Sequence, residues 1–320
     1  LHSLRRRQRQ MCIRDSLRLI HKIKPDIVHL HSSIAGAAGR LLKLLGLIKC
    51  PVVYTPHCFA FTYEQNPVRE RLFRLAESYL APFTDALVCV SESEAAIARS
   101  AGIPSSKIFV IPNGIRLPPA VDEKSRLKAR SEIGVEPGKF VIGTLGRLNV
   151  QKAPLDFVKM LAFVCRKEKD VYGVWVGDGP LRKKLEEIVA KKNIPGVKFM
   201  GQLDRRILPY IYNSADYYVM ASKYEGLPLS LLEAMSCGIP CIVSDIPTLS
   251  IVREANCGIC IDFSRLTSRG DEKLDIVVDF IQSRNKKYSI NARRYVTRNF
   301  DLDRVAERYV SEFSSFYKIQ

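Results

Sequence analysis

Short apolar runs alternate with amphipathic stretches through most of this 320-residue chain, beginning near residue 17. Apolar runs of about four to six residues suit strands buried on both faces, and apolar residues at helical spacing suit the helices that cover them. The alternation therefore predicts parallel sheets with crossover helices. The expected strands are residues 26–30, 51–55, 85–90, 107–111, 140–145, 171–176, 197–199, 216–220, 241–243 and 258–261, and the expected helices include residues 33–45, 67–80 and 92–100.

A polar segment that contains prolines divides this alternation into two α/β units. The first sixteen residues carry five arginines, show no apolar periodicity and do not begin with methionine, so we set them aside as a non-native segment. No strand with a Gly-rich turn precedes residue 26, so we expect an incomplete N-terminal domain. The expected segments are the non-native residues 1–16, a first domain at 17–118, a second domain at 119–285, and C-terminal helices at 286–320 that cross back toward the first domain.

The formal net charge of +17 favours an anionic partner, which can be nucleic acid, anionic lipid or a phosphorylated substrate. The sequence has no apolar run of about 18 residues and no secretory signal pattern, so we expect a cytoplasmic protein. Nine scattered cysteines are typical of reduced core residues. Four of them approach zinc-ribbon spacing, but they include residues of strand-like runs, so we predict no metal site at Cys237, Cys241, Cys257 and Cys260.

Two glutamates lie around the start of the helix expected after residues 216–220. Glu225 falls in the loop, and Glu233 falls about a turn and a half inside the helix, where its side chain leans back toward the N-terminus. Backbone N–H groups near such a helix start, with the helix dipole behind them, favour anionic or hydroxyl-rich ligands. One carboxylate can then accept hydrogen bonds from a ribose and the other from a sugar, with Gly226, Leu227, Pro228 and Leu229 as the backbone between them.

Two further loops follow expected strands. In the first, Gly146 permits close approach of the backbone, and Arg147 with Lys152 can neutralise a diphosphate. In the second, Gly177 and Gly179 flank an aspartate in a turn between strand and helix, and a simple turn is an adequate interpretation.

The stretch around the two glutamates resembles the EX7E motif of retaining glycosyltransferase family 4, whose usual form is E-G-x-P-L-x-x-L-E-A-M-x-x-G-x-P. The resemblance extends over most of residues 24–316 and implies the GT-B fold, in which two Rossmann-like, doubly wound domains face a cleft. The loop from Gly146 to Lys152 resembles the family's G-R-L-x-x-x-K, except that Ala153 stands where the family usually has glycine. The matching motif residues are Glu225, Gly226, Pro228, Leu229, Leu232, Glu233, Ala234, Met235, Gly238 and Pro240.

The resemblance also implies roles for these residues. Arg147 and Lys152 would stabilise the departing diphosphate, Glu225 and His57 would hold the transferred sugar, and the loop of Gly177 and Gly179 would face the base. His57 follows an expected strand, and we expect His29 to face the core and His31 the cleft. Asp301 and Asp303 have the letters of a metal-binding Asp-x-Asp, but they precede a helix, where an N-cap is the simpler interpretation.

The implied reaction is metal-independent transfer of a hexose, with retention and without a cofactor, from a nucleoside-diphosphate sugar to a hydroxyl. A UDP-sugar is the favoured donor, and cell-surface polysaccharide or glycolipid assembly the favoured setting. A sugar-nucleotide 2-epimerase of the same fold, a truncated inactive scaffold and a basic nucleic-acid-binding protein stay open as alternatives. No nucleic-acid recognition motif supports the last of these, so we expect no nucleic-acid partner.

The helix expected at residues 67–80 carries an apolar stripe, with arginines at 69, 71 and 74 beside it. For this helix alone, packing of the stripe on the N-terminal sheet is the simpler interpretation. The chain's basic charge, and the lipid-linked acceptors of many relatives, favour instead a peripheral protein on the anionic inner face of the cytoplasmic membrane. The stripe consists of Val68, Leu72, Leu75 and Tyr79.

Overall fold

The computed structural model describes residues 15–63, 66–118, 123–136, 138–204, 208–263 and 272–314. The chain divides into two compact units. The first runs as far as Pro112 and is joined by the chain from Val305 onward, and the second is Asn113–Arg304. Most of the segment set aside as non-native, residues 1–14, lies outside the described residues, and residues 15–23 are helical.

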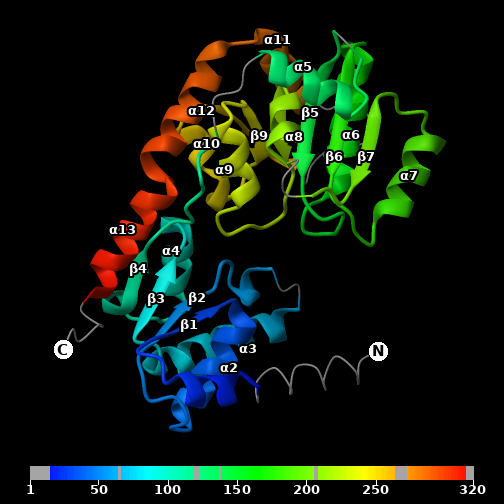
Figure 1. The fold of residues 1–320 in the computed structure, drawn as a ribbon. Coiled ribbons are helices and arrows are strands. Elements are labelled where there is room, and N and C mark those ends of the chain that lie inside the picture. The colour runs from blue at the N-terminus through cyan, green and yellow to red at the C-terminus, as the bar shows by residue number, and fades with distance from the viewer. Residues whose placement is uncertain are drawn as a thin grey trace. The chain divides into compact units, whose positions relative to one another are not determined.

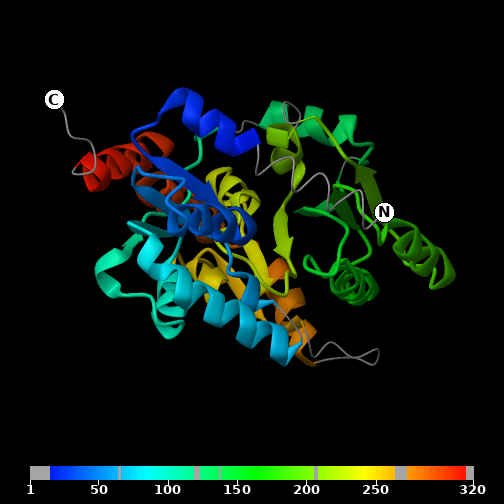
Figure 2. The same ribbon diagram turned by 90° about the horizontal axis from the view of Figure 1, so that it is seen from below.

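The first unit is built on a four-stranded parallel sheet in the order β1-β2-β3-β4. Each strand lies within two residues of its predicted bounds, and helices α2 and α3 contact one another (Figure 2). The strands are β1 (Val28–His31), β2 (Val52–Thr55), β3 (Ala86–Cys89) and β4 (Ile108–Val110), and the helices are α2 (Ser33–Leu44), α3 (Pro67–Leu80) and α4 (Glu92–Ser100), with short 3-10 helices at Ala60–Thr62, Ala81–Phe83 and Ser105–Lys107.

Alternate residues of these strands pack into two separate cores, as the period of two in a strand requires. Tyr54 and Leu87 belong to the core that also contains Phe59 and Ala95. Their neighbours Val53 and Val88 belong to the other core, to which helix α13 (Leu302–Phe313) contributes Val305 and Phe313. The last helix of the chain therefore completes the first unit.

The second unit contains a six-stranded parallel sheet in the order β10-β9-β8-β5-β6-β7 (Figure 1). The strand order reverses direction between β5 and β8, which in doubly wound folds marks the place where ligands bind at the carboxyl ends of the strands. The strands are β5 (Phe140–Leu145), β6 (Val171–Val176), β7 (Val197–Gly201), β8 (Tyr217–Met220), β9 (Cys241–Ser244) and β10 (Gly258–Ile261).

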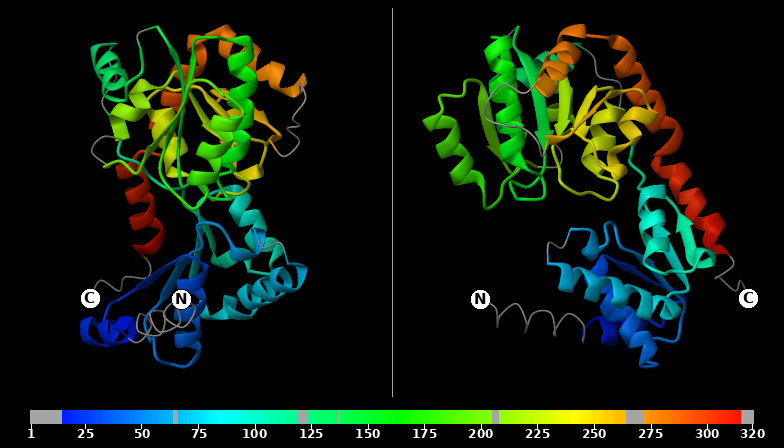
Figure 3. Two further views of the ribbon diagram at one scale, coloured as in Figure 1. Left: turned by 90° about the vertical axis from the view of Figure 1, so that its right-hand side faces the viewer. Right: turned by 180° about the vertical axis from the view of Figure 1, so that it is seen from behind.

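Helices cover both faces of this sheet. Helix α6 contacts β6, α7 and α11, whereas α8 contacts α5, and α9 contacts α12 (Figure 3). A large apolar core includes Phe157 and Leu161 of α6 with Trp175 of β6. The helices are α5 (Glu123–Glu132), α6 (Pro154–Lys167), α7 (Arg182–Lys191), α8 (Leu208–Ser214), α9 (Leu229–Ser236), α10 (Ile251–Glu254), α11 (Glu272–Ser283) and α12 (Lys286–Asn299), with a 3-10 helix at Pro247–Leu249.

Residues 300 and 301 separate α12 from α13. There, Ile115 N donates to Phe300 O at 2.8 Å, and Leu302 N donates to Ile115 O at 3.0 Å. The side chain of Asp301 accepts hydrogen bonds from the backbone of Asp303 at 3.2 Å and Arg304 at 3.4 Å. The interpretation of Asp301 as a helix cap is therefore confirmed.

Candidate functional site

Three loops leave the carboxyl edge of the second sheet side by side. They follow β6, β5 and β8, which are adjacent parallel strands, so their ends lie at one edge. The loops hold eleven of the twelve site residues that we predicted from the sequence, or lead directly into the helix that holds them. The twelfth, His57, belongs to the first unit.

The glycines of two of these loops allow backbone to lie directly against backbone. Gly177 has a φ of +129°, and a Cβ added there would stand 2.1 Å from Gly146 O. A Cβ on Gly179 would stand 2.5 Å from Leu148 O. The loops are further joined by a hydrogen bond from Trp175 Nε1 to Gly146 O at 2.9 Å. These glycines are required by the packing of the loops, whatever ligand they meet.

Lys152 and Glu225 form an ion pair across two of the loops, with Nζ 2.6 Å from Oε1. The side chains are 18% and 7% exposed, so both charges are largely withdrawn from water. Gln151 braces the same two loops, because its O accepts from Lys223 N at 2.8 Å and its Nε2 donates to Tyr224 O at 3.1 Å. Gln151 therefore joins the loop that carries Lys152 to the loop that carries Glu225.

Arg147 belongs to the same loop as Lys152, is exposed, and forms no ion pair with any residue that the structure describes. Its guanidinium is free to bind an anion. Ala153, directly after Lys152, has a φ of +45° and caps the start of α6. Left-handed backbone of this kind favours glycine, which is the residue expected there from the family pattern.

Glu233 lies on α9, as predicted, and is half-buried. Its Oε2 accepts a hydrogen bond from Tyr212 Oη at 2.6 Å. Pro228 takes the N-cap position just before the helix, one residue earlier than a first-turn proline. The carbonyl of Leu227 accepts from Asn113 Nδ2 at 2.8 Å, which fixes the loop that leads from Glu225 into the helix.

Sequence reasoning missed three of these contributors. Gln151 lies within a motif that we singled out, but nothing in the motif distinguishes it as a brace. Asn113 lies in the irregular segment after β4, and its contact with Leu227 spans 114 positions. Tyr212 precedes a strand without any local pattern that sets it apart. All three act through long-range contacts, which a single sequence does not reveal.

His57 lies just after β2 in the first unit, with a φ of +58°. Its Nε2 lies 2.9 Å from Nδ1 of His31, and the two rings stack. Partial desolvation of the ring, together with the nearby His31, lowers the pKa of His57 from its ordinary value and so favours the neutral imidazole. A neutral imidazole can donate or accept a hydrogen bond to a sugar hydroxyl.

The expectation that His29 faces the core is wrong. His29 and His31 lie two residues apart in edge strand β1 and therefore on the same side, and both are exposed. Their ring centroids are 4.1 Å apart. His29 Nε2 contacts the Thr55 hydroxyl at 2.8 Å, and the ring end of the side chain is partly shielded from water there although the residue as a whole is exposed. This desolvation, followed by the nearby His31 and His57, lowers the pKa of His29 to about 4.

The apolar stripe of α3 does not pack on the N-terminal sheet. Its four side chains, Val68, Leu72, Leu75 and Tyr79, are 57% to 70% exposed. The opposite side of the helix is the buried one, because Glu77 is paired with Arg40 at 2.7 Å. Arg74 also turns inward, pairing with Glu70 at 3.3 Å and lying over Phe61, whereas Arg69 and Arg71 are exposed.

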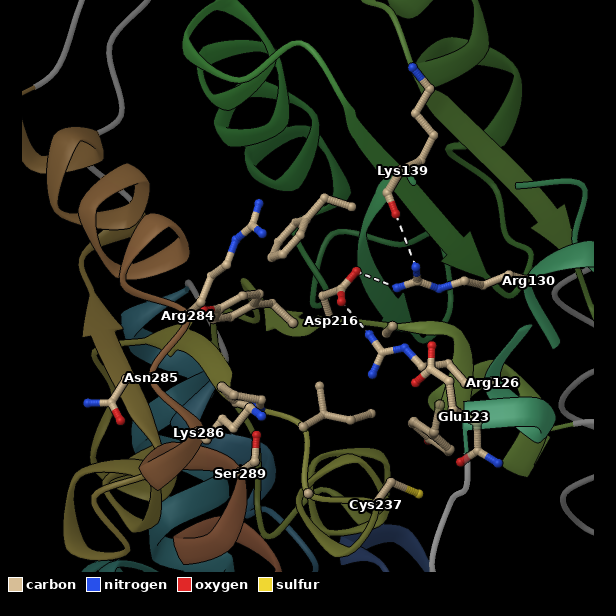
Figure 4. A pocket seen from close by; sticks show the side chains of 18 of the residues that line it. Glu123, Arg126, Arg130, Lys139, Asp216, Cys237, Arg284, Asn285, Lys286 and Ser289 are labelled. Atoms are coloured by element: carbon tan, nitrogen blue, oxygen red, sulfur yellow. Dashed lines mark hydrogen bonds and ion pairs between the residues drawn. The ribbon is translucent and has the colours of Figure 1, made fainter. Parts of the chain in front are cut away.

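A cavity of about 550 Å³ lies at the other, amino-terminal edge of the second sheet (Figure 4). Asp216 lies between Arg126 and Arg130 there, bonds to both, and accepts from Val141 N at 2.7 Å. Arg130 also donates to the backbone of Ser214 at 3.0 Å. These arginines are thus engaged in joining α5 to the sheet, and the cavity contains none of the predicted site residues.

Two α/β units, each built on a parallel sheet, are the architecture of GT-B enzymes. The Glycosyl transferases group 1 family matches residues 125–289, and Glycosyltransferase Family 4 matches residues 2–117. The chain therefore belongs to the glycosyltransferases, and it has the GT-B fold.

Relatives agree with this assignment. An Escherichia coli UDP-Gal:alpha-D-GlcNAc-diphosphoundecaprenol alpha-1,3-galactosyltransferase is 35% identical over 72% of this chain, which spans 60% of that protein's length. An alpha-monoglucosyldiacylglycerol synthase of Streptococcus pneumoniae is 26% identical over 73% of this chain, and the matched region covers 55% of the length of that synthase. The fold is similar to that of Anabaena HepE in complex with UDP-glucose, with a TM-score of 0.79, 19% identity and coverage of 95% of this chain and 82% of HepE.

Among the residues that the structure describes, no helix is both long and apolar enough to cross a membrane.

Proposed function

We propose that this chain transfers a hexose from a nucleoside-diphosphate sugar, with UDP as the favoured nucleotide, to a hydroxyl acceptor with retained anomeric configuration. The observation that carries the proposal is the Lys152–Glu225 pair beside Arg147, at the strand edge where a doubly wound sheet binds its ligand. The relatives' named donors and the UDP complexes of fold neighbours support the choice of nucleotide.

In the proposed reaction, the bond between the sugar C1 and the diphosphate oxygen breaks, and a bond from the acceptor oxygen to C1 forms on the same face. The acceptor's proton passes to the departing diphosphate. Arg147 and Lys152 stabilise the negative charge that develops on that diphosphate. Glu225 and His57 hold the sugar hydroxyls, and Glu233 accepts hydrogen bonds from the ribose. No metal ion or cofactor takes part.

The charge site is tested by Lys152→Ala, with turnover of a UDP-hexose as the readout. We expect a loss of at least about 100-fold, which corresponds to about 3 kcal/mol of transition-state stabilisation. Lys223→Ala, which removes an exposed lysine from the neighbouring loop, is the matched control and should keep normal turnover. Near-normal turnover of the Lys152 variant removes this lysine from the mechanism. Activity should also persist in EDTA, and a strict need for a divalent metal contradicts the proposal.

The two glutamates should separate in calorimetry. Glu233→Ala should weaken binding of the free nucleoside diphosphate, because its proposed partner is the ribose. Glu225→Ala should leave that affinity nearly unchanged while lowering transfer, because its proposed partner is the sugar. Equal losses of affinity in both variants rule out this division of roles. Product analysis with donor alone distinguishes transfer from 2-epimerisation.

For the acceptor, we propose a lipid-linked or glycolipid substrate in cell-surface polysaccharide or glycolipid assembly, reached from the cytoplasmic face of an anionic membrane. The exposed stripe of α3, with Arg69 and Arg71 on its two flanks, supports this surface. The acceptor named for the Escherichia coli relative, a sugar linked to diphosphoundecaprenol, is of the same kind.

Vesicle flotation tests the membrane surface. The chain should float with vesicles that contain anionic lipid, and binding should fade as salt rises, because exposed charges are screened. Leu72→Asp should abolish flotation, whereas Leu127→Asp, at a leucine of α5 that is 53% exposed, should not. Absence of binding to anionic vesicles, together with transfer to a soluble acceptor, contradicts the membrane proposal and leaves the donor chemistry intact.

A further inference from the structure

Tyr212 is a buried tyrosine whose hydroxyl ends at a carboxylate of the candidate site. Only 4% of the residue is exposed, and its Oη lies 2.6 Å from Glu233 Oε2. Tyr212 comes from α8, which precedes β8, and Glu233 comes from α9, which follows it. The contact therefore joins the helix that precedes β8 in the sequence to the helix that follows it, and β8 is the strand that leads to Glu225.

Glu233 has few other partners. No lysine or arginine in the described part of the chain pairs with it, and the Tyr212 hydroxyl is its one side-chain hydrogen bond there. An ionised carboxylate offers about four lone-pair sites, so most of its accepting capacity is unfilled. A half-buried carboxylate in this condition is poised to accept hydrogen bonds from a ligand.

The phenol is a fixed donor. Burial, followed by the nearby Tyr218 and then by Glu233 itself, raises the pKa of Tyr212 well above its ordinary value. The hydroxyl therefore keeps its proton at neutral pH, and it donates that proton's hydrogen bond to the carboxylate. The Tyr212 ring lies 6.1 Å from that of Tyr218, whose own hydroxyl donates to Leu145 O at 3.4 Å.

We propose that Tyr212 is a positioning residue for the nucleotide: its hydroxyl holds the Glu233 carboxylate in the orientation that receives the ribose hydroxyls. This inference rests on the proposed function, which gives Glu233 its ribose partner. The phenol occupies one site on Oε2, and no side chain among the described residues donates to Oε1. Without that hydroxyl, the carboxylate would rotate among orientations, and the ribose would have to order it on binding.

The test is calorimetry on the 320-residue chain with UDP, GDP and ADP, continued with the nucleotide that binds most tightly. Tyr212→Phe removes one hydroxyl and nothing else. We expect about tenfold weaker binding, or about 1.4 kcal/mol, within the range for hydrogen bonds to charged groups. The matched control is Tyr217→Phe, another buried tyrosine, whose hydroxyl donates to the backbone of Phe280 at 3.2 Å and which should keep full affinity.

Two further measurements separate positioning from a general structural effect. The 2′-deoxy form of the nucleotide lacks one hydroxyl that Glu233 would bind, so Tyr212→Phe should weaken it less than the ribonucleotide. On a Glu233→Gln background, Tyr212→Phe should add little further loss, because the two residues act through one contact. Equal losses for both nucleotides, or full additivity, would overturn the proposal.

The outcomes also distinguish this inference from the function on which it rests. If Glu233→Gln weakens binding and Tyr212→Phe does not, the positioning role is wrong and the ribose site stands. If Glu233→Gln binds normally, the ribose site is wrong, and the positioning role falls with it. If none of the three nucleotides binds the unaltered chain, the donor assignment itself fails.

Discussion

Gly177→Ala should destabilise the loops after β5 and β6 more than an ordinary glycine substitution does. The added Cβ would lie 2.1 Å from Gly146 O, which is backbone and cannot swing aside. The same oxygen accepts from Trp175 Nε1 at 2.9 Å, and Gly146 N donates to Val176 O at 3.0 Å. To admit the methyl group, the two loops must separate, and both hydrogen bonds are lost or stretched.

The magnitude follows from three contributions. A non-glycine residue at a φ of +129° costs on the order of 1–3 kcal/mol. Loss of two buried hydrogen bonds costs about 2 kcal/mol together. The lower entropy of the unfolded alanine chain returns about 0.4–1 kcal/mol. We therefore expect Gly177→Ala to lower the free energy of unfolding by about 2–4.5 kcal/mol, a large part of the 5–15 kcal/mol typical of a folded domain.

Two other glycines serve as controls. Gly138 has a φ of +82° with nothing within 4 Å of an added Cβ, so Gly138→Ala tests the backbone term alone and should cost about 1 kcal/mol. Gly179 lacks a positive φ, but an added Cβ would lie 2.5 Å from Leu148 O. Gly179→Ala therefore tests the steric clash with the neighbouring loop without the backbone strain. Its cost should fall between the other two.

The chain provides its own probe, because Trp175 is the only tryptophan and bonds to the loop in question. Urea unfolding followed by tryptophan fluorescence therefore reports on the second unit. The reasoning is refuted if Gly177→Ala shifts the midpoint no more than Gly138→Ala, with unchanged slopes. That result would mean that the loops separate at little cost.

Two further predictions concern residues outside the loops that follow β5 and β6. Burial raises the pKa of Glu94 from 4.5 to about 7, so the folded state binds more protons than the unfolded state between these values, and stability should fall as pH rises through this window. Glu94→Gln should remove this fall in stability, which amounts to about 3 kcal/mol by pH 8. The control Glu92→Gln, on the exposed face of the same helix, should keep the fall. Equal pH profiles of thermal unfolding for the unaltered protein and both variants contradict the assignment. Asn113→Ala removes the hydrogen bond to Leu227 O, so we expect about fivefold weaker nucleotide binding by calorimetry, and unchanged affinity would show that the bond does not position the loop.

The strands were predictable because they are short, largely apolar runs that are bounded by polar turns. Residues 140–145, 171–176 and 258–261 have the predicted bounds, and the others differ by one or two residues at an end. The place of the site was also predictable, since parallel strands put their following loops at one edge. The pairing of Lys152 with Glu225 did not follow from the sequence, because it depends on how two loops 73 positions apart meet.

The α3 stripe shows where periodicity fails. Helical spacing identifies an apolar face, but it does not say whether that face turns toward its own domain or away from it. Here the buried side is set by Glu77, which pairs with Arg40 and accepts from the Tyr54 hydroxyl at 3.1 Å. A buried ion pair between residues 37 positions apart has no signature in a single sequence. The usual preference for apolar burial therefore gave the wrong orientation.

Ala153 stands at a left-handed backbone position where the family usually has glycine. The family pattern expects glycine there, and the φ of +45° supplies the reason, since left-handed backbone costs an alanine about 1 kcal/mol or more. Two effects offset this cost: the methyl group is buried, which contributes about 0.8 kcal/mol, and alanine restricts the unfolded chain, which contributes about 0.4–1 kcal/mol. The terms nearly cancel, so alanine can replace glycine without displacing Lys152, whose backbone N–H still bonds to Asn149 Oδ1 at 3.1 Å. A β-branched residue would meet the same strain with far more crowding, so the position requires a small side chain and not glycine itself.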